Sequence, residues 1–142
     1  MRVRSSSFFL VLVAVIALAV AGLGQKVKQT SAPPTSAASG QEMYVSYCAA
    51  CHGQDLKGGG PAAAALKVAP TDLTTLARRN GGKFPTLHVS HIIAGEEVYP
   101  AHGSKDMPVW GPAFRALSQH DKSVVMLRID NLTKYLEEHQ VK

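Results

Sequence analysis

The stretch that decides the fold is Cys48-Ala49-Ala50-Cys51-His52, which contains both cysteines of the 142-residue chain. The C-x-x-C-H spacing is the attachment pattern of a c-type haem. Two thiols three residues apart can form thioether bonds to the two vinyl groups of the haem, and the histidine that follows presents its imidazole to the iron. The pentapeptide therefore predicts one covalently attached haem c per chain, held by Cys48 and Cys51, with His52 as an axial ligand of the iron.

The same five residues have three competing interpretations: a thioredoxin-like redox pair, half of a zinc site, or a short disulfide loop. A zinc site needs a second pair of ligands, and the chain has no further cysteine. A thioredoxin-like motif needs strands and helices that alternate around it, and the sequence has no such pattern. Haem attachment is the preferred interpretation, because it uses both cysteines and the histidine at once.

The first 24 residues have the composition of an export segment. Arg2 and Arg4 precede an uninterrupted apolar run from Phe8 to Leu23. Small residues at Ala19 and Ala21 favour a cleaved signal peptide, and the length of the run keeps an uncleaved N-terminal membrane anchor open. We therefore expect a periplasmic protein, either soluble after cleavage or anchored to the inner membrane.

Two further regions follow the export segment. Residues 25–40 are small and polar without apolar periodicity, which predicts a disordered linker. Residues 41–142 are about a hundred residues long, a length typical of one domain. We expect this domain to be monomeric.

The charge distribution bears on the class of partner. The whole chain has a net charge of +5, with 15 basic and 10 acidic residues. Four of the basic residues precede residue 41, so the predicted domain carries 11 basic against 10 acidic residues, or about +1. This balance argues against a nucleic-acid partner.

Helical signals cover the predicted domain. The expected helices are Gln41–Tyr47, Leu73–Asn80 after an N-cap at Asp72, a helix that Pro85 opens and Gly95 closes, and a last helix after Asp121. In the last helix, apolar residues recur at helical spacing at Val125, Ile129, Leu132 and Leu136. No segment alternates with a period of two, so the sequence predicts an all-α fold.

The second axial ligand decides what the iron can do. An iron with two protein ligands passes electrons, whereas an open position binds gases or peroxide. The candidates are Met43, Met107, Met126, His88, His91, His102, His120 and His139. Met107 is preferred to a core-filling role, because Pro108 stiffens the backbone directly after it and a thioether is a soft ligand that favours ferrous iron. His102 is the next candidate, and we expect Met126 to pack against the first helix.

The other polar residues suggest no catalytic chemistry. The Trp110 indole N–H is a candidate donor to a haem propionate, with plain burial an equal alternative. His88 and His91 are three residues apart on a predicted helix, but a surface or propionate-contacting role is favoured because no third ligand is nearby in sequence. The sequence contains no hydrolytic triad or phosphate-binding loop, so we expect an electron carrier and not an enzyme.

Taken together, these residues resemble a known family, the class I cytochromes c, particularly small exported bacterial ones. The resemblance covers about Gly40 to Gln140. Besides the haem motif it rests on Gly60-Pro61, Ala69-Pro-Thr-Asp-Leu-Thr74, Met107-Pro-Val-Trp-Gly111, Arg128-Ile129 and Tyr135-Leu136.

The resemblance implies the cytochrome c fold, with about four to five helices around one haem. It implies that the Pro61 carbonyl accepts the Nδ1 proton of His52, which would fix the tautomer of the ligand. It also implies that the first and last helices cross where Gly40 and Tyr44 meet Leu132 and Tyr135.

The predicted function is one-electron transfer between respiratory-chain partners, through a haem with His52 and Met107 as iron ligands. The expected partners are redox proteins, which a cytochrome meets in small, transient interfaces. Two alternatives remain: a tethered cytochrome c subunit of an oxidase or dehydrogenase complex, and a haem enzyme or gas sensor with an open distal site.

Overall fold

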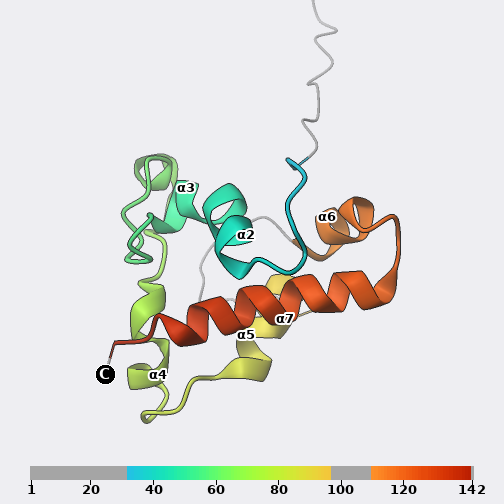
Figure 1. The fold of residues 1–142 in the computed structure, drawn as a ribbon. Helices are drawn as coiled ribbons and strands as arrows, with labels where there is room; N and C mark the ends of the chain where they lie inside the picture. The colour runs from blue at the N-terminus through green and yellow to red at the C-terminus, as the bar shows by residue number, and fades with distance from the viewer. Residues whose placement is uncertain (1–31, 97–109, 142) are drawn as a thin grey trace, which may run out of the picture. The chain divides into compact units, whose positions relative to one another are not determined.

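A computed structural model describes residues 32–96 and 110–141. The helices, in chain order, are α2 (Gly40–Tyr47), α3 (Ala49–His52), the 3-10 turns η1 (Ala63–Ala65) and η2 (Leu73–Thr75), α4 (Leu76–Arg79), α5 (Thr86–Ala94), α6 (Trp110–Leu117) and α7 (Lys122–Glu138) (Figure 1). No strand occurs within these two ranges. The all-α prediction is confirmed, with six α-helices in the described residues where four to five were expected, because α3 and α4 are single turns.

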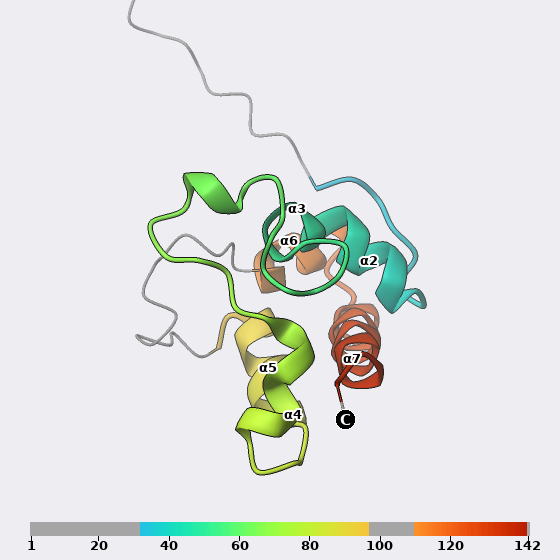
Figure 2. The same cartoon turned by 90° about the vertical axis from the view of Figure 1, so that its left-hand side faces the viewer.

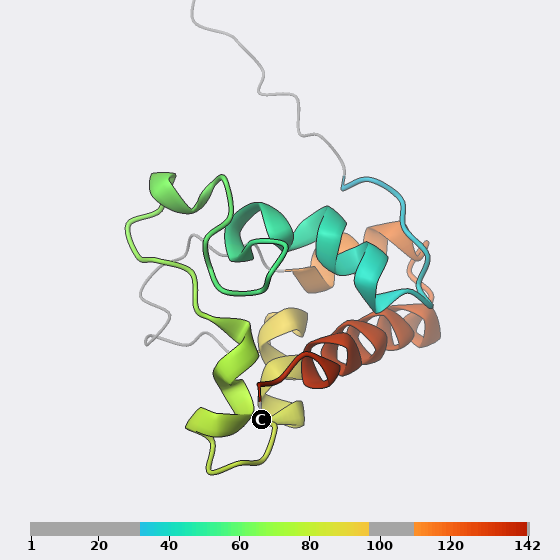
Figure 3. The same cartoon turned by 60° about the vertical axis from the view of Figure 1, so that its left-hand side comes forward.

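Helix α7 is the longest element, and α2 and α5 both pack against it. Figure 2 shows α7 nearly end-on, and Figure 3 shows α2 and α5 on different sides of it. Helix α6 contacts both α5 and α7. Because α3 directly follows α2, this packing places the cysteine motif beside the core.

The predicted helix boundaries agree with the caps in the structure. The Asp121 carboxylate accepts hydrogen bonds from the amides of Ser123 and Val124 and so begins α7. Asp72 accepts from the amide of Thr74 and begins η2, so the single helix expected here is a 3-10 turn followed by α4. Gly95 ends α5 in the left-handed conformation, with φ of 76°.

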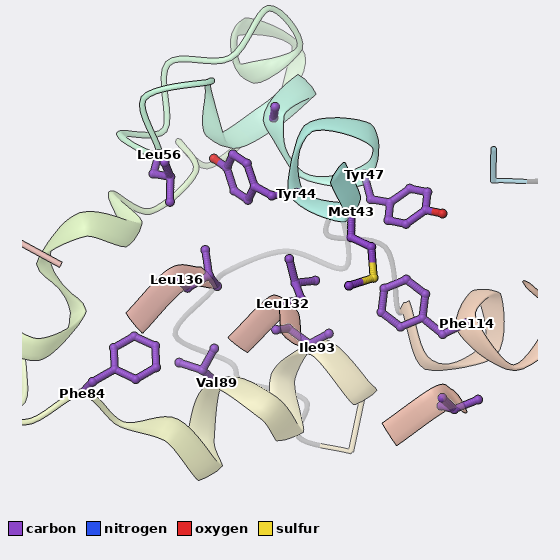
Figure 4. Close-up of a cluster of buried hydrophobic side chains, with 12 residues drawn as sticks. Met43, Tyr44, Tyr47, Leu56, Phe84, Val89, Ile93, Phe114, Leu132 and Leu136 are labelled. Carbon is purple, nitrogen blue, oxygen red and sulfur yellow. The ribbon is translucent and has the colours of Figure 1, made fainter. Parts of the chain in front are cut away.

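The core lies between α2, α5 and α7 (Figure 4). Leu132 and Leu136 on α7 lie between Tyr44 on α2 and the pair Val89 and Ile93 on α5. Its largest fully buried side chains are Tyr44, Phe114, Met43, Leu132 and Thr133. The apolar face predicted for the last helix is thus confirmed.

Met126 does not pack against the first helix, contrary to the prediction. Its side chain is 64% exposed. The reason is its place on α7, one residue after the buried Val125 and therefore turned about 100° away from the inner face. Met43 fills the core position instead and is fully buried.

The last part of the predicted linker is bound to the domain, which corrects the prediction of disorder for residues 32–40. We call residues 32–39 the strap. Its backbone carbonyls at Pro33, Thr35 and Ala37 accept hydrogen bonds from Tyr47, Arg128 and Asn131. Gly40 is already the first residue of α2, with the Ser39 side chain as its N-cap.

Helices α2 and α7 cross at Gly40, as the family resemblance implied. A Cβ at this position would collide with the Asn131 carbonyl oxygen and would lie 2.7 Å from the Cβ of Tyr135. The rings of Tyr44 and Tyr135 meet next to this contact, with centroids 5.4 Å apart. A residue without a side chain therefore allows the close approach of the two backbones.

Several predictions fall outside the described residues. The export segment, linker residues 25–31, His102 and Met107 are among them. Within residues 32–96 and 110–141, no helix is long and apolar enough to cross a membrane.

Candidate functional site

The cysteine motif consists of Cys48, the N-cap residue of α3, and the four residues of α3 itself, and the chain that follows wraps back onto this single turn. The carbonyl oxygens of Ala50, Cys51 and His52 accept hydrogen bonds from the amides of Ala62, Gly60 and Gly58 at 2.8, 3.0 and 2.7 Å. A helix normally leaves its last carbonyls without intrahelical partners. The glycine-rich loop satisfies them here, which holds the motif in place despite the shortness of its helix.

Two glycines make this wrapping possible. Gly58 has φ of +88°, and a Cβ there would collide with the Pro70 carbonyl oxygen. A Cβ on Gly60 would collide with the Ala50 carbonyl oxygen. The loop can therefore approach the backbones on both sides only where it carries no side chain.

His52 is oriented by a backbone carbonyl. Its Nδ1 lies 3.0 Å from the Thr71 carbonyl oxygen. A carbonyl can only accept a hydrogen bond, so Nδ1 carries the proton, and in the neutral ring Nε2 keeps its lone pair. This is the arrangement that metal-binding histidines usually show.

The acceptor is Thr71 and not Pro61, which corrects the expectation drawn from the family resemblance. Pro61 is exposed on the glycine-rich loop, whose neighbouring amides bind the carbonyls of α3. Thr71 is held near His52 because the Leu73 amide, two residues on, donates to the Leu56 carbonyl at 2.8 Å. Asp72 lies between Thr71 and Leu73 in the sequence. A hydrogen bond from the Thr74 hydroxyl lowers the pKa of the Asp72 carboxyl.

Tyr44 ties α2 to the residue after the motif. Its hydroxyl donates to the Gly53 carbonyl at 2.6 Å in a buried position. Burial raises the pKa of this hydroxyl above its ordinary value, so it remains a donor at neutral pH. This bond holds the backbone directly after His52, and the Thr71 contact holds the His52 ring.

The two cysteines are partly exposed and are not joined to each other. Burial raises the pKa of the Cys48 thiol to about 12, with the nearby Cys51 as a smaller cause. A thiolate is therefore disfavoured here, whereas the neutral sulfur of a thioether suits the site. In the described part of the chain, no three His, Cys, Asp or Glu side chains cluster as a metal site would require.

An apolar cavity adjoins the motif. Its lining consists of Tyr44, Cys48, His52, Thr71, Leu73, Leu76, His88, Val89, Ile92, Ile93, Trp110, Leu132 and Leu136. Eight of these thirteen are aliphatic residues or tryptophan, contributed by η2, α4, α5, α6 and α7. A flat, largely apolar macrocycle fits such walls, and His52 and Cys48 belong to the same lining.

The structure thus brings Cys48, His52 and Trp110 to one cavity and places Cys51 in the same helical turn. Pro61 is not part of this cavity lining. The sequence did not predict Tyr44 and Thr71 as site residues, because Tyr44 acts through the carbonyl of Gly53 and Thr71 acts through its own backbone. The segment from residue 69 to residue 74, already noted as family-like, was the available signal for Thr71.

A comparison with protein-family models matches residues 35–125 to the family described as cytochrome c oxidase, cbb3-type, subunit III. The chain belongs to this cytochrome c family. No curated protein and no solved structure matches the chain. The match begins inside the strap, which agrees with the strap being part of the cytochrome c domain.

Membership places the chain among the class I monohaem cytochromes c. A cytochrome c domain implies haem-based electron transfer and redox proteins as partners. Together with the cysteine pair it also implies covalently attached haem c, and the apolar cavity beside Cys48 and His52 fits that group.

Proposed function

We propose that this cytochrome c is a one-electron carrier whose haem is held by Cys48 and Cys51, with His52 and Met107 as the two axial ligands. The observation that carries the proposal is the His52 geometry: a carbonyl binds its Nδ1, and its side chain lines an apolar cavity. The bound haem supplies an iron that alternates between the ferric and ferrous states.

The residues around the cavity have separate tasks in this proposal. The Thr71 carbonyl holds the His52 ring in one tautomer and orientation and makes it a better electron donor to the metal. The leucines and isoleucines of α5 and α7 exclude water, which disfavours the more highly charged ferric state. Trp110 lines the same cavity and is a candidate donor to a propionate.

Met107 is proposed from its place in the sequence. It precedes Trp110, the first residue of α6, by three positions, and Trp110 lines the cavity. A thioether ligand raises the reduction potential, and two permanent protein ligands leave no site for a substrate. The proposed protein is therefore a carrier and not an enzyme.

Absorption spectra of the haem-loaded protein test this ligand pair. We expect the wild type to be low-spin, to show the ferric methionine charge-transfer band, and not to bind carbon monoxide when reduced. Met107→Ala should lose the band and bind carbon monoxide, because the substitution opens one iron position. A wild type that binds carbon monoxide readily would instead favour the haem enzyme or gas sensor.

Two matched variants sharpen the test. Met126→Ala removes an exposed methionine of α7 and should leave every spectrum unchanged. His102→Ala removes the next candidate ligand and should also leave the methionine band in place. If His102→Ala abolishes the band and Met107→Ala keeps it, the assignment of the distal ligand is wrong.

A role inside a respiratory complex is the second candidate, favoured by the description of the matching family as an oxidase subunit. The same electron-transfer chemistry would then serve one fixed acceptor. Purification from native membranes separates the two roles, because a subunit co-purifies with a large complex and a free carrier does not. The intact mass of the purified protein would show whether the proposed export segment, residues 1–24, is cleaved or kept as an anchor.

A further inference from the structure

Tyr47 is buried next to the cysteine motif, yet it is neither a proposed iron ligand nor a haem attachment residue. It is the last residue of α2 and directly precedes Cys48, and its side chain is 8% exposed. Its ring meets the Trp110 ring at a centroid distance of 5.1 Å and the Phe114 ring at 5.7 Å. The Tyr47 side chain therefore links the end of α2, next to the cysteine motif, to α6.

The Tyr47 hydroxyl is held by the strap. It donates to the Pro33 carbonyl at 2.6 Å and lies 2.7 Å from the Thr35 Oγ1. Thr35 Oγ1 in turn accepts from the Arg128 guanidinium at 3.0 Å. Since the Thr35 hydroxyl has one proton and the Tyr47 oxygen can accept it, all of these contacts can form at once.

Trp110 is the residue that this arrangement supports. It lines the cavity assigned to the haem, and its ring also stacks on Phe114 at 6.1 Å. The next residue, Gly111, meets the Ala94 carbonyl so closely that a Cβ could not be accommodated. With α5 against its backbone and Tyr47 against its ring, Trp110 has little freedom to leave the cavity wall.

We propose that Tyr47 is a positioning residue for the haem site, which holds Trp110 in the cavity wall and is itself fixed by the strap through its hydroxyl. The inference rests on the proposed haem function. Because Met107, the proposed distal ligand, lies three residues before Trp110 in the sequence, we expect displacement of Trp110 to make that ligand easier to replace. The role differs from ordinary core packing because it depends on a hydroxyl group that does not touch the cavity.

The test uses the full-length, haem-loaded protein with Tyr47→Phe, Thr35→Val and both substitutions together. The chain has a single tryptophan, so its indole Nε1–H gives one NMR resonance in the reduced, diamagnetic protein, and the exchange rate of this proton with solvent reports on Trp110 directly. Imidazole titration of the ferric protein reports on the ease of displacing the distal ligand. Tyr135→Phe is the matched control, since it removes a tyrosine hydroxyl from α7 outside the cavity lining.

We expect Tyr47→Phe and Thr35→Val to speed the exchange of the Trp110 indole proton and to raise the imidazole affinity about three- to tenfold, the range that the Tyr47–Thr35 contact shared by both variants would give. The double variant should add little to either single variant, because both act on the same contact. Tyr135→Phe should match the wild type in both measurements.

The inference is overturned if Tyr47→Phe leaves either the indole exchange rate or the imidazole affinity at the wild-type value, even if it unfolds at lower urea concentration. That result would reduce Tyr47 to a packing residue. Failure of the proposed ligand pair has a different signature, because the wild type itself would then lack the methionine band. The indole exchange measurement still tests Tyr47 in that case, because the reduced carbon monoxide complex is also diamagnetic.

Discussion

Arg128 is a buried cation whose partners in the described residues carry no formal charge. Its side chain is 6% exposed, and it donates to the Ser118 hydroxyl and to the hydroxyl and carbonyl of Thr35. Burying a guanidinium is costly, and here three neutral oxygens offset the cost. The planar group reaches both the strap and Ser118, the residue that follows α6, at the same time.

Replacing Arg128 should therefore destabilise the domain. We expect Arg128→Leu to lower the free energy of unfolding by about 2–4 kcal/mol, because the part-buried Thr35 carbonyl loses its donor. Arg128→Lys should recover little, since an ammonium cannot reproduce the fork of donors. Urea unfolding of the haem-loaded protein measures both.

The exposed Lys134 on the same helix is the control for this prediction. Its ammonium lies 3.9 Å from Glu138 with 72% of its side chain exposed, so Lys134→Ala should change stability by less than about 0.5 kcal/mol. An Arg128→Leu protein as stable as the wild type would mean that the desolvation cost of the cation cancels the gain from its hydrogen bonds.

At the scale of elements, the crossing of α2 and α7 depends on Gly40. Alanine is a better helix former than glycine by about 1 kcal/mol, yet its methyl group would overlap the Asn131 carbonyl. Overpacking costs about 1–3 kcal/mol, so we expect Gly40→Ala to be net destabilising in a denaturant titration.

Gly59→Ala provides the comparison, because a Cβ there meets no atom within 4 Å. This variant should be neutral or slightly stabilising. Equal stability of the two alanine variants would show that the helices can move apart at no cost.

Local signals predicted the elements well. Asp121 and Gly95 stand at the ends of helices because a carboxylate caps free amides and a glycine adopts positive φ, and both properties belong to single residues. The apolar spacing of α7 likewise identifies its inner face. The haem motif is equally local, so the covalent cofactor could be inferred from five residues.

Non-local contacts were the part that the sequence did not reveal. The acceptor for His52 is a backbone carbonyl, which every residue possesses, so nothing in the side chains separates Thr71 from Pro61. The strap has no apolar periodicity, and its order depends on Arg128, which lies 93 residues from Thr35 along the chain. Such contacts follow only from the packed fold.

At the scale of the whole molecule, side-chain hydrogen bonds hold both ends of the domain against its helices. At the N-terminal end, Arg128 of α7 binds Thr35 of the strap. At the C-terminal end, Gln140 binds the backbone of η2 and α4. The Gln140 side chain accepts from the Ala77 amide at 2.9 Å and donates to the Leu73 carbonyl at 2.8 Å. Both ends of the domain are therefore part of its cooperative structure.

A shortened chain tests the domain boundary. Protein that begins at residue 32 should unfold like the full chain, whereas protein that begins at residue 40 should be less stable by about 2–4 kcal/mol, because the strap's hydrogen bonds and the Ser39 cap are removed. Urea midpoints of the haem-loaded forms provide the comparison. Identical midpoints would mean that the strap adds nothing to the stability of the domain and acts only as a linker.

The close approach of Gly111 to the Ala94 carbonyl has a consequence for how this family can vary in length. It brings together one point of the backbone on α5 and one on α6, which are separated by sixteen residues of chain. Residues inserted between them would add only the slowly rising entropy of a longer loop, about 0.6 kcal/mol for each doubling. Insertions and deletions should therefore accumulate between α5 and α6, while α2 and α7 keep their lengths.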